Sequence, residues 1–209
     1  MSAVPNEVSG GVASRSHTNR NVDSTGEAFA SLTPELVIAL CGPIGSPLHE
    51  AASEIANALR DFDYTTEVVR LSDMIRLNAS TVNVQIDDGD KFGEINALIS
   101  AGDALRQRYG HDVLAKLAIA KISAARSRKF GHFTDGANEL GKVAAAQIKG
   151  HRICHIVNSV KNKAELELLR LIYGDALFAV GVFSPLDVRK ANMEHLWGLQ
   201  LSSIEKLID

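Results

Sequence analysis

Several features that mark particular protein classes are scarce in this chain of 209 residues. It has two cysteines and no Cys-x-x-Cys pair, which argues against a disulfide framework or a zinc site in this chain. Its formal net charge of -3 lacks the basic excess of general nucleic-acid or membrane-surface binders. No apolar run approaches the roughly 18 residues of a membrane span. We therefore expect a cytoplasmic protein without a membrane partner and without general nucleic-acid binding.

Composition divides the chain into a tail and one domain. Residues 1–33 are rich in Ser, Asn, Gly, Thr and Arg, and we expect them to be disordered. Residues 34–209 are long enough for one well-buried domain. The whole chain is 45% apolar and 22% charged, as globular proteins are. Cys41 and Cys154 stand in apolar runs and are expected to be small core residues.

Short apolar runs alternate with amphipathic stretches along the domain. We expect strands at 35–41, 65–71, 153–157 and 176–183, helices at 47–59, 72–77, 94–109, 112–126 and 163–173, and further helices from 185 and 202. Residues 81–93 are expected to form a loop. Within 129–150 only residues 143–148 favour a helix. Ser46, Ser72 and Ser184 stand where helix caps are expected.

This alternation predicts an α/β fold with a mostly parallel sheet, a three-layer sandwich of the P-loop NTPase or nucleotide-kinase type. In such sheets the strand carboxyl ends share one edge, where ligands bind. Gly42, Asn158 and Ser184 are expected at that edge.

The turn after the first strand is the motif that carries chemistry. It runs Gly42-Pro43-Ile44-Gly45-Ser46-Pro47-Leu48-His49. A complete phosphate loop is G-x-x-x-x-G-K-[ST], so Pro47, Leu48 and His49 replace its second glycine, lysine and hydroxyl. A helix N-terminus and two glycines still favour an anion. The loop is therefore expected to bind a nucleotide without fast phosphoryl transfer.

Asn158 ends the third strand, where P-loop enzymes usually carry the Asp that organises Mg²⁺. A neutral amide is a weaker partner for that cation, so the sequence gives little support for Mg²⁺. We assign no catalytic residue and no metal ligand. The candidate nucleotide-binding residues are Gly42, Pro43, Ile44, Gly45, Ser46, Leu48, His49, Arg106, Asn158 and Arg189.

Other polar residues have simpler interpretations. The basic residues Arg106, Arg108, Arg126, Arg128 and Lys129 could close over phosphates, but solvated helix faces are the commoner fate of such runs. His151 and His155 would lie roughly 13 Å apart along a strand and are more simply structural.

Four stretches resemble the N-terminal P-loop domain of the anti-phage dCTP/dCMP deaminases. They are Gly42 to Ser46, Val69 to Asp73, Gly102 to Arg106, and the most specific block, Asn158 to Val182. In that family a kinase-like domain precedes a zinc deaminase domain, and together they deplete deoxycytidine nucleotides during phage infection. This chain contains neither H-x-E nor P-C-x-x-C, so the deaminase half is not within it.

The resemblance implies a degenerate, regulatory nucleotide-binding domain that takes an NTP or dNTP. Its partner would be a zinc deaminase domain on the same polypeptide or a partner chain. A homo-oligomer is also possible. Two alternatives remain open. One is an interaction scaffold with a vestigial pocket, supported if Leu48 or His49 fills the phosphate position. The other is an active nucleoside or nucleotide kinase that uses a substitute lysine, such as Lys129 or Lys142.

Overall fold

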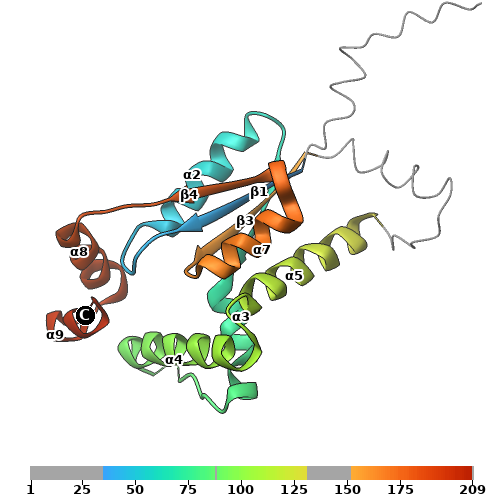
Figure 1. Cartoon of the computed structure of the whole chain (residues 1–209). Coiled ribbons are helices and arrows are strands. Elements are labelled where there is room, and N and C mark those ends of the chain that lie inside the picture. Colours follow the sequence, from blue (N-terminus) through green and yellow to red (C-terminus); the bar gives the residue numbers. More distant parts are fainter. Residues whose placement is uncertain (1–34, 88, 131–151, 209) are drawn as a thin grey trace, which may run out of the picture. The chain divides into compact units, whose positions relative to one another are not determined.

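A computed structural model describes residues 35–87, 89–130 and 152–208, with the side chains of Lys129 and Phe130 excepted. These residues form an α/β fold around a four-stranded parallel sheet (Figure 1). The strand order is β2 (Thr65–Arg70), β3 (Ile153–Val160), β1 (Glu35–Cys41) and β4 (Leu177–Gly181). The expected tail at 1–33 and helix at 143–148 lie outside the described residues.

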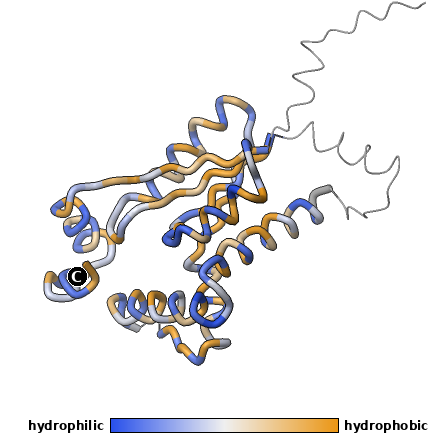
Figure 2. Tube along the Cα trace, viewed as in Figure 1, coloured by the Kyte–Doolittle hydropathy of each residue, from blue (hydrophilic) through white to orange (hydrophobic). Residues whose placement is uncertain are grey.

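The central strands are apolar because helices cover both of their faces. In β3 the six residues from Ile153 to Asn158 are all buried, and β1 is buried from Val37 to Leu40. Continuous burial of this kind is characteristic of parallel sheets. Figure 2 shows the same strands as the most hydrophobic part of the trace. The expectation of an α/β fold with a parallel sheet is confirmed.

The two faces of the sheet are covered by different helices. Helix α2 (Leu48–Arg60) packs on one face, against Ile38, Leu40 and Ile156. The other face, which includes Val37, Ala39 and Val157, is covered by residues of four helices (Figure 1). These are α3 (Leu71–Asn78), α4 (Lys91–Tyr109), α5 (Val113–Phe130) and α7 (Lys163–Tyr173).

Neighbouring strands β1 and β3 are therefore followed by helices on opposite faces of the sheet. The chain leaves β1 into α2 on one face and leaves β3 into α7 on the other. This is a topological switch point, where the carboxyl ends of adjacent parallel strands open a crevice for ligands. The glycine-containing turn at residues 42–47 follows β1 directly at this point.

After β4 the chain forms α8 (Leu186–Trp197) and α9 (Leu201–Ile208). Met193 of α8, Ile204 of α9 and Leu199 between the two helices make a separate buried cluster. Ile44 of the turn and Phe92 of α4 pack against it. Helix α8 is thereby brought against the turn that follows β1. Short 3₁₀ helices occur at Ala79–Val82 and Gly174–Ala176.

The expected helix caps are wrong at three positions. Helices α2, α3 and α8 follow Pro47, Arg70 and Pro185, and none of the three has a side-chain cap. Side chains instead cap two helices for which the sequence indicated no cap. Asp90 accepts from the N–H groups of Phe92 and Gly93, and Asn162 accepts from Ala164. Helix α4 consequently begins three residues earlier than expected, at Lys91.

The expectations for Gly110 and Cys154 are confirmed. Gly110 ends α4 with a φ of 104°, a conformation that favours glycine. Cys154 is buried and Cys41 is half-buried. Among the described helices, none combines the length and the apolar character that a membrane crossing requires.

Candidate functional site

The turn between β1 and α2 is shaped by two glycines. Gly45 is buried and has a φ of 79°, and a Cβ there would lie 2.7 Å from the carbonyl oxygen of Arg189. A Cβ on Gly42 would lie 2.7 Å from the carbonyl oxygen of Val182. Both positions therefore require glycine, because the backbones of two other segments approach the turn closely.

The carbonyl groups of the turn accept hydrogen bonds from other elements. Lys161 Nζ donates to the carbonyl of Gly42. Arg189 Nε donates to the carbonyl of Ile44 at 2.7 Å, and Asn192 Nδ2 donates to that of Gly45 at 3.0 Å. Two of these three donors are cationic.

Several backbone N–H groups of the same segment, unlike its carbonyl groups, have no hydrogen-bond partner in the described part of the chain. Within the described residues, the backbone N–H groups of Gly45, His49 and Glu50 make no hydrogen bond. Those of His49 and Glu50 belong to the first turn of α2, where a helix has unpaired donors and a partial positive charge. We call this segment, residues 42–49 together with Lys161 and Arg189, the cradle. Its free donors and cations suit an anion.

Lys161 supplies the cation that the turn itself lacks. It follows β3 at the switch point, and its ammonium group reaches across to the turn after β1. Burial lowers the pKa of Lys161, and the nearby positive charges of Arg189 and Arg106 lower it further. Like charges held together in this way repel one another, and a bound anion would relieve that repulsion.

Glu165 fixes the segment that carries Lys161. Its side chain is fully buried, and its Oε2 accepts from the backbone N–H groups of Lys161 at 3.0 Å and Asn162 at 3.1 Å. Its Oε1 accepts from Arg106 Nε at 2.9 Å. One carboxylate thus holds both the lysine segment and an arginine of α4 in place.

Leu48 and His49, which replace the lysine and the hydroxyl residue of a complete phosphate loop, lie in different surroundings. Leu48 is 7% exposed and packs into the core beneath the sheet, so it does not fill the phosphate position. His49 is exposed, and its Nδ1 lies 3.3 Å from Asn158 Nδ2. The pair links the first turn of α2 to the end of β3. Neither Leu48 nor His49 offers the oxygen ligand that Mg²⁺ prefers in such loops.

The backbone beside Asn158 is unusual. Ser159 has a φ of 73°, and the pairing of β1 with β3 shifts register at this point. The shift puts Cys41 opposite Val160 instead of Ser159. A non-glycine residue in the left-handed region is uncommon and concentrates at functional sites. Here the bulge ends regular pairing just before Lys161.

Most of the predicted site residues come together. The turn residues, His49, Asn158 and Arg189 converge at the switch point through the contacts above. Ser46 Oγ is buried there without a hydrogen-bond partner among the described residues. Pro43 lies at the turn but is exposed, and Arg106 lies beyond Lys161 on α4. The other expected basic residues are used elsewhere: Arg126 pairs with Glu35, and Arg108 donates to the carbonyl of Thr81.

Sequence reasoning missed Lys161, Glu165 and Asn192. The substitute lysine was sought at Lys129 and Lys142, and the side chain of the first and the whole of the second lie outside the described residues. A signal for Lys161 was present, since it comes three residues after Asn158 at the end of a central strand. Using that signal requires the strand order, which places the ends of β3 and β1 side by side.

The described part of the chain contains no group of three or more His, Cys, Asp or Glu side chains that could hold a metal ion. Comparisons with known proteins add no assignment, because no family model matches the chain and no curated protein matches it.

Proposed function

We propose that this chain is a non-catalytic nucleotide-binding domain with a degenerate phosphate loop, and that it regulates a deoxycytidylate deaminase domain on the same polypeptide or on a partner chain. The observation that carries the nucleotide part is the Lys161 ammonium group seated on the Gly42 carbonyl. With Arg189 it brings two cations to a turn whose N–H donors remain free. That combination suits the phosphates of an NTP or dNTP.

The deaminase part of the proposal has a different support. It depends on the resemblance of residues 42–46, 69–73, 102–106 and 158–182 to the P-loop domain of anti-phage deaminases. Lys161 and Glu165 fall within the most specific of these stretches, Asn158 to Val182. The regulatory role follows from the cradle chemistry, since a site that holds phosphates without catalysing their transfer can act as a sensor.

The scaffold alternative predicts a phosphate position filled by a side chain of the turn. Leu48 instead faces the core, and His49 lies to the side, against Asn158. The kinase alternative requires Mg²⁺ chemistry, for which the His49 and Asn158 pair is poorly suited. Nucleotide binding without catalysis therefore has the better support.

Calorimetry on the whole chain tests this proposal. A panel of NTPs and dNTPs is titrated in EDTA and again with Mg²⁺. We expect at least one nucleotide to bind in EDTA, because Lys161 and Arg189 supply the positive charge. If no nucleotide gives a binding signal up to millimolar concentration, nucleotide binding is ruled out and the interaction-scaffold alternative is favoured. Phosphate transfer from ATP to dCMP or another acceptor in the presence of Mg²⁺ would instead establish a kinase.

A further inference from the structure

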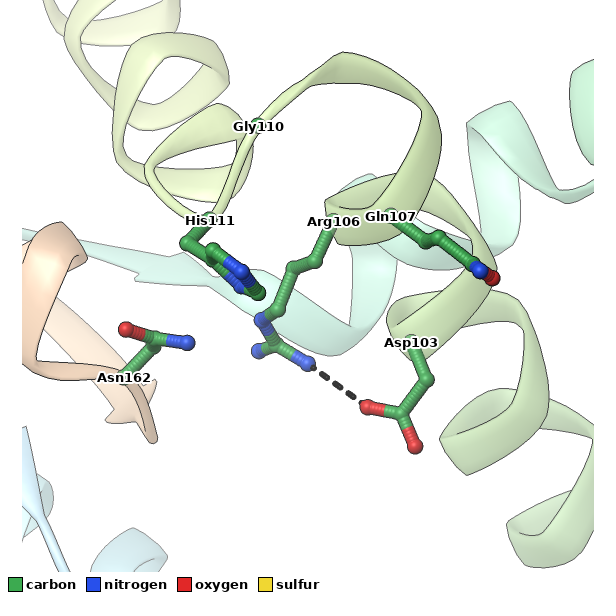
Figure 3. A pocket seen from close by; sticks show the side chains of 6 residues that line it. All are labelled: Asp103, Arg106, Gln107, Gly110, His111 and Asn162. Atoms are coloured by element: carbon green, nitrogen blue, oxygen red, sulfur yellow. Dashed lines mark hydrogen bonds and ion pairs between the residues drawn. The ribbon is translucent and has the colours of Figure 1, made fainter.

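An open cavity of about 520 Å³ lies beside Lys161 of the cradle, between the C-terminal half of α4, the connection from α4 to α5 and the residue that precedes α7. It is lined by Asp103, Arg106, Gln107, Gly110, His111 and Asn162 (Figure 3). Cavities that hold small ligands usually measure about 300–1,000 Å³, so a molecule of nucleoside size fits. Asn162 follows Lys161 in the chain, with about 3.8 Å between their Cα atoms. The cavity and the cradle are thus lined by consecutive residues of the chain.

The cavity offers hydrogen-bonding groups of both kinds. The Asn162 Oδ1 is occupied by the N–H of Ala164, and Figure 3 shows its amide nitrogen directed towards Arg106 and His111. The His111 ring is exposed and makes no hydrogen bond to the other described residues. The Asp103 side chain is 73% exposed and presents carboxylate oxygens as acceptors. This mixture suits a heterocyclic base or a sugar, which carry donors and acceptors together.

Charge separates the cavity from the cradle. In the cavity, Arg106 is balanced by Asp103, with Nη1 and Oδ1 3.4 Å apart, and by the buried Glu165 behind it. The cradle has Lys161 and Arg189 on the carbonyls of the turn. A doubly charged phosphate would meet the Asp103 carboxylate and an already paired Arg106 in the cavity, and two cations on uncharged carbonyl groups in the cradle. The anionic end of a ligand is thus directed to the cradle, and its uncharged end to the cavity.

We infer that this cavity is the nucleoside subsite of the chain: it holds the base and sugar of a nucleotide whose phosphates lie in the cradle. The inference rests on the proposed function and adds the direction in which the ligand lies. It places the nucleoside beside α4 and the start of α7, away from α8. Glu165, which contacts both Arg106 and the Lys161 backbone, joins the two subsites.

The test compares a ligand that has a nucleoside with one that has only phosphates. ATP, dCTP and inorganic tripolyphosphate are titrated by calorimetry into the wild-type chain and into Asp103→Ala and His111→Ala. Asp175→Ala and His195→Ala are matched controls, because both residues are exposed and neither lines the cavity. All four substitutions are at exposed positions, so the variants are expected to fold, and circular dichroism checks this.

We expect ATP or dCTP to bind about 10-fold more tightly than tripolyphosphate to the wild-type chain. Each cavity variant should weaken that nucleotide about 3- to 10-fold and leave tripolyphosphate within about 2-fold of wild type. Unchanged nucleotide affinity in both cavity variants would overturn the nucleoside subsite but would not contradict phosphate binding in the cradle. Equal losses for nucleotide and tripolyphosphate would show a phosphate in the cavity, which also overturns it. Failure of the wild-type chain to bind any of the three would overturn the proposed function as well.

Discussion

Charged and polar side chains cluster at both ends of the strands, which we call the amino edge and the carboxyl edge of the sheet. The two clusters differ in how their charges are paired. At the amino edge, Arg126 Nε and Nη2 donate to the two oxygens of Glu35 at 2.8 and 2.6 Å. His155 lies between carboxylates, 3.3 Å from Glu35 and 3.6 Å from Glu67. At the carboxyl edge, Lys161 and Arg189 donate to uncharged carbonyl groups, and Glu165 is the buried carboxylate nearby.

This difference separates a structural cluster from a binding site. Arg126 and Glu35 satisfy one another through two hydrogen bonds, so this pair needs no ligand. Cations that are directed at neutral carbonyl groups keep part of their charge for another partner. The amino-edge cluster also stacks Arg126 on the Tyr173 ring, 5.6 Å from its centroid, which occupies its guanidinium further. We therefore interpret the amino edge as structural and the carboxyl edge as the ligand site.

The largest expected effect is on Glu165, the paired member of the carboxyl edge. Glu165→Ala removes the acceptor of three hydrogen bonds and leaves Arg106 without its buried partner. We expect a loss of about 3–5 kcal/mol in the free energy of unfolding, measured by urea denaturation. Glu167→Ala on the same helix is the matched control. Its side chain is 63% exposed and it pairs with Lys163, so its effect should stay below about 1 kcal/mol. Equal effects in the two variants would contradict the structural role of Glu165.

Arg126→Ala breaks the amino edge and tests whether it is separate from the binding site. Loss of the two hydrogen bonds to Glu35 should lower the free energy of unfolding by about 2 kcal/mol. Affinity for tripolyphosphate, measured by calorimetry on the folded variant, should stay within about 2-fold of wild type. The exposed Arg128 is the matched control residue on the same helix. A large loss of affinity in Arg126→Ala would show that the edges are coupled and would end the comparison.

The smallest expected effect is a pH dependence at the amino edge. Burial alone would raise the pKa of Glu35, but the contacts with His155 and Arg126 outweigh it, and the pKa lies below its usual value of 4.5. The folded state therefore binds this proton less readily than the unfolded state, and the resulting stability is present above about pH 4.5. It is lost as the pH falls through the folded-state pKa.

Glu35→Gln should remove that contribution. The free energy of unfolding, measured by urea denaturation between pH 6 and pH 3, should fall less steeply for the variant than for wild type. The difference should be about 1 kcal/mol or less over the range. Parallel curves would mean that Glu35 does not contribute to acid sensitivity. Glu54→Gln, at an exposed position on α2, is the control that should follow wild type.

The sequence was informative where a pattern is local. The apolar runs predicted all four strands of the described sheet, and the two glycines of the 42–47 turn marked the carboxyl end of β1. The helix caps were less predictable, because helix boundaries shift by one or two residues: α2, α3 and α8 follow Pro47, Arg70 and Pro185, which do not cap through their side chains. The bulge at Ser159 has no local signal.

Lys161 could not be identified from local pattern for a physical reason. Its role depends on β3 lying beside β1, although well over a hundred residues separate it from Gly42 in the chain. A search confined to the turn finds no cation, and this led to the expectation of binding without fast phosphoryl transfer. The pairing of Glu165 with Arg106 could not be predicted for the same reason, because it joins α7 to α4, two helices that are far apart in the sequence.

The central claim is that Lys161 supplies the charge missing from the phosphate loop, and calorimetry with tripolyphosphate tests it most directly. Lys161→Ala is compared with Lys163→Ala, whose side chain is 87% exposed two residues further on, at the start of α7. The account predicts a loss of affinity of about 10- to 100-fold for Lys161→Ala, the value of a hydrogen bond to a charged group. It predicts less than about 2-fold for Lys163→Ala. Equal affinities in the two variants would contradict the account.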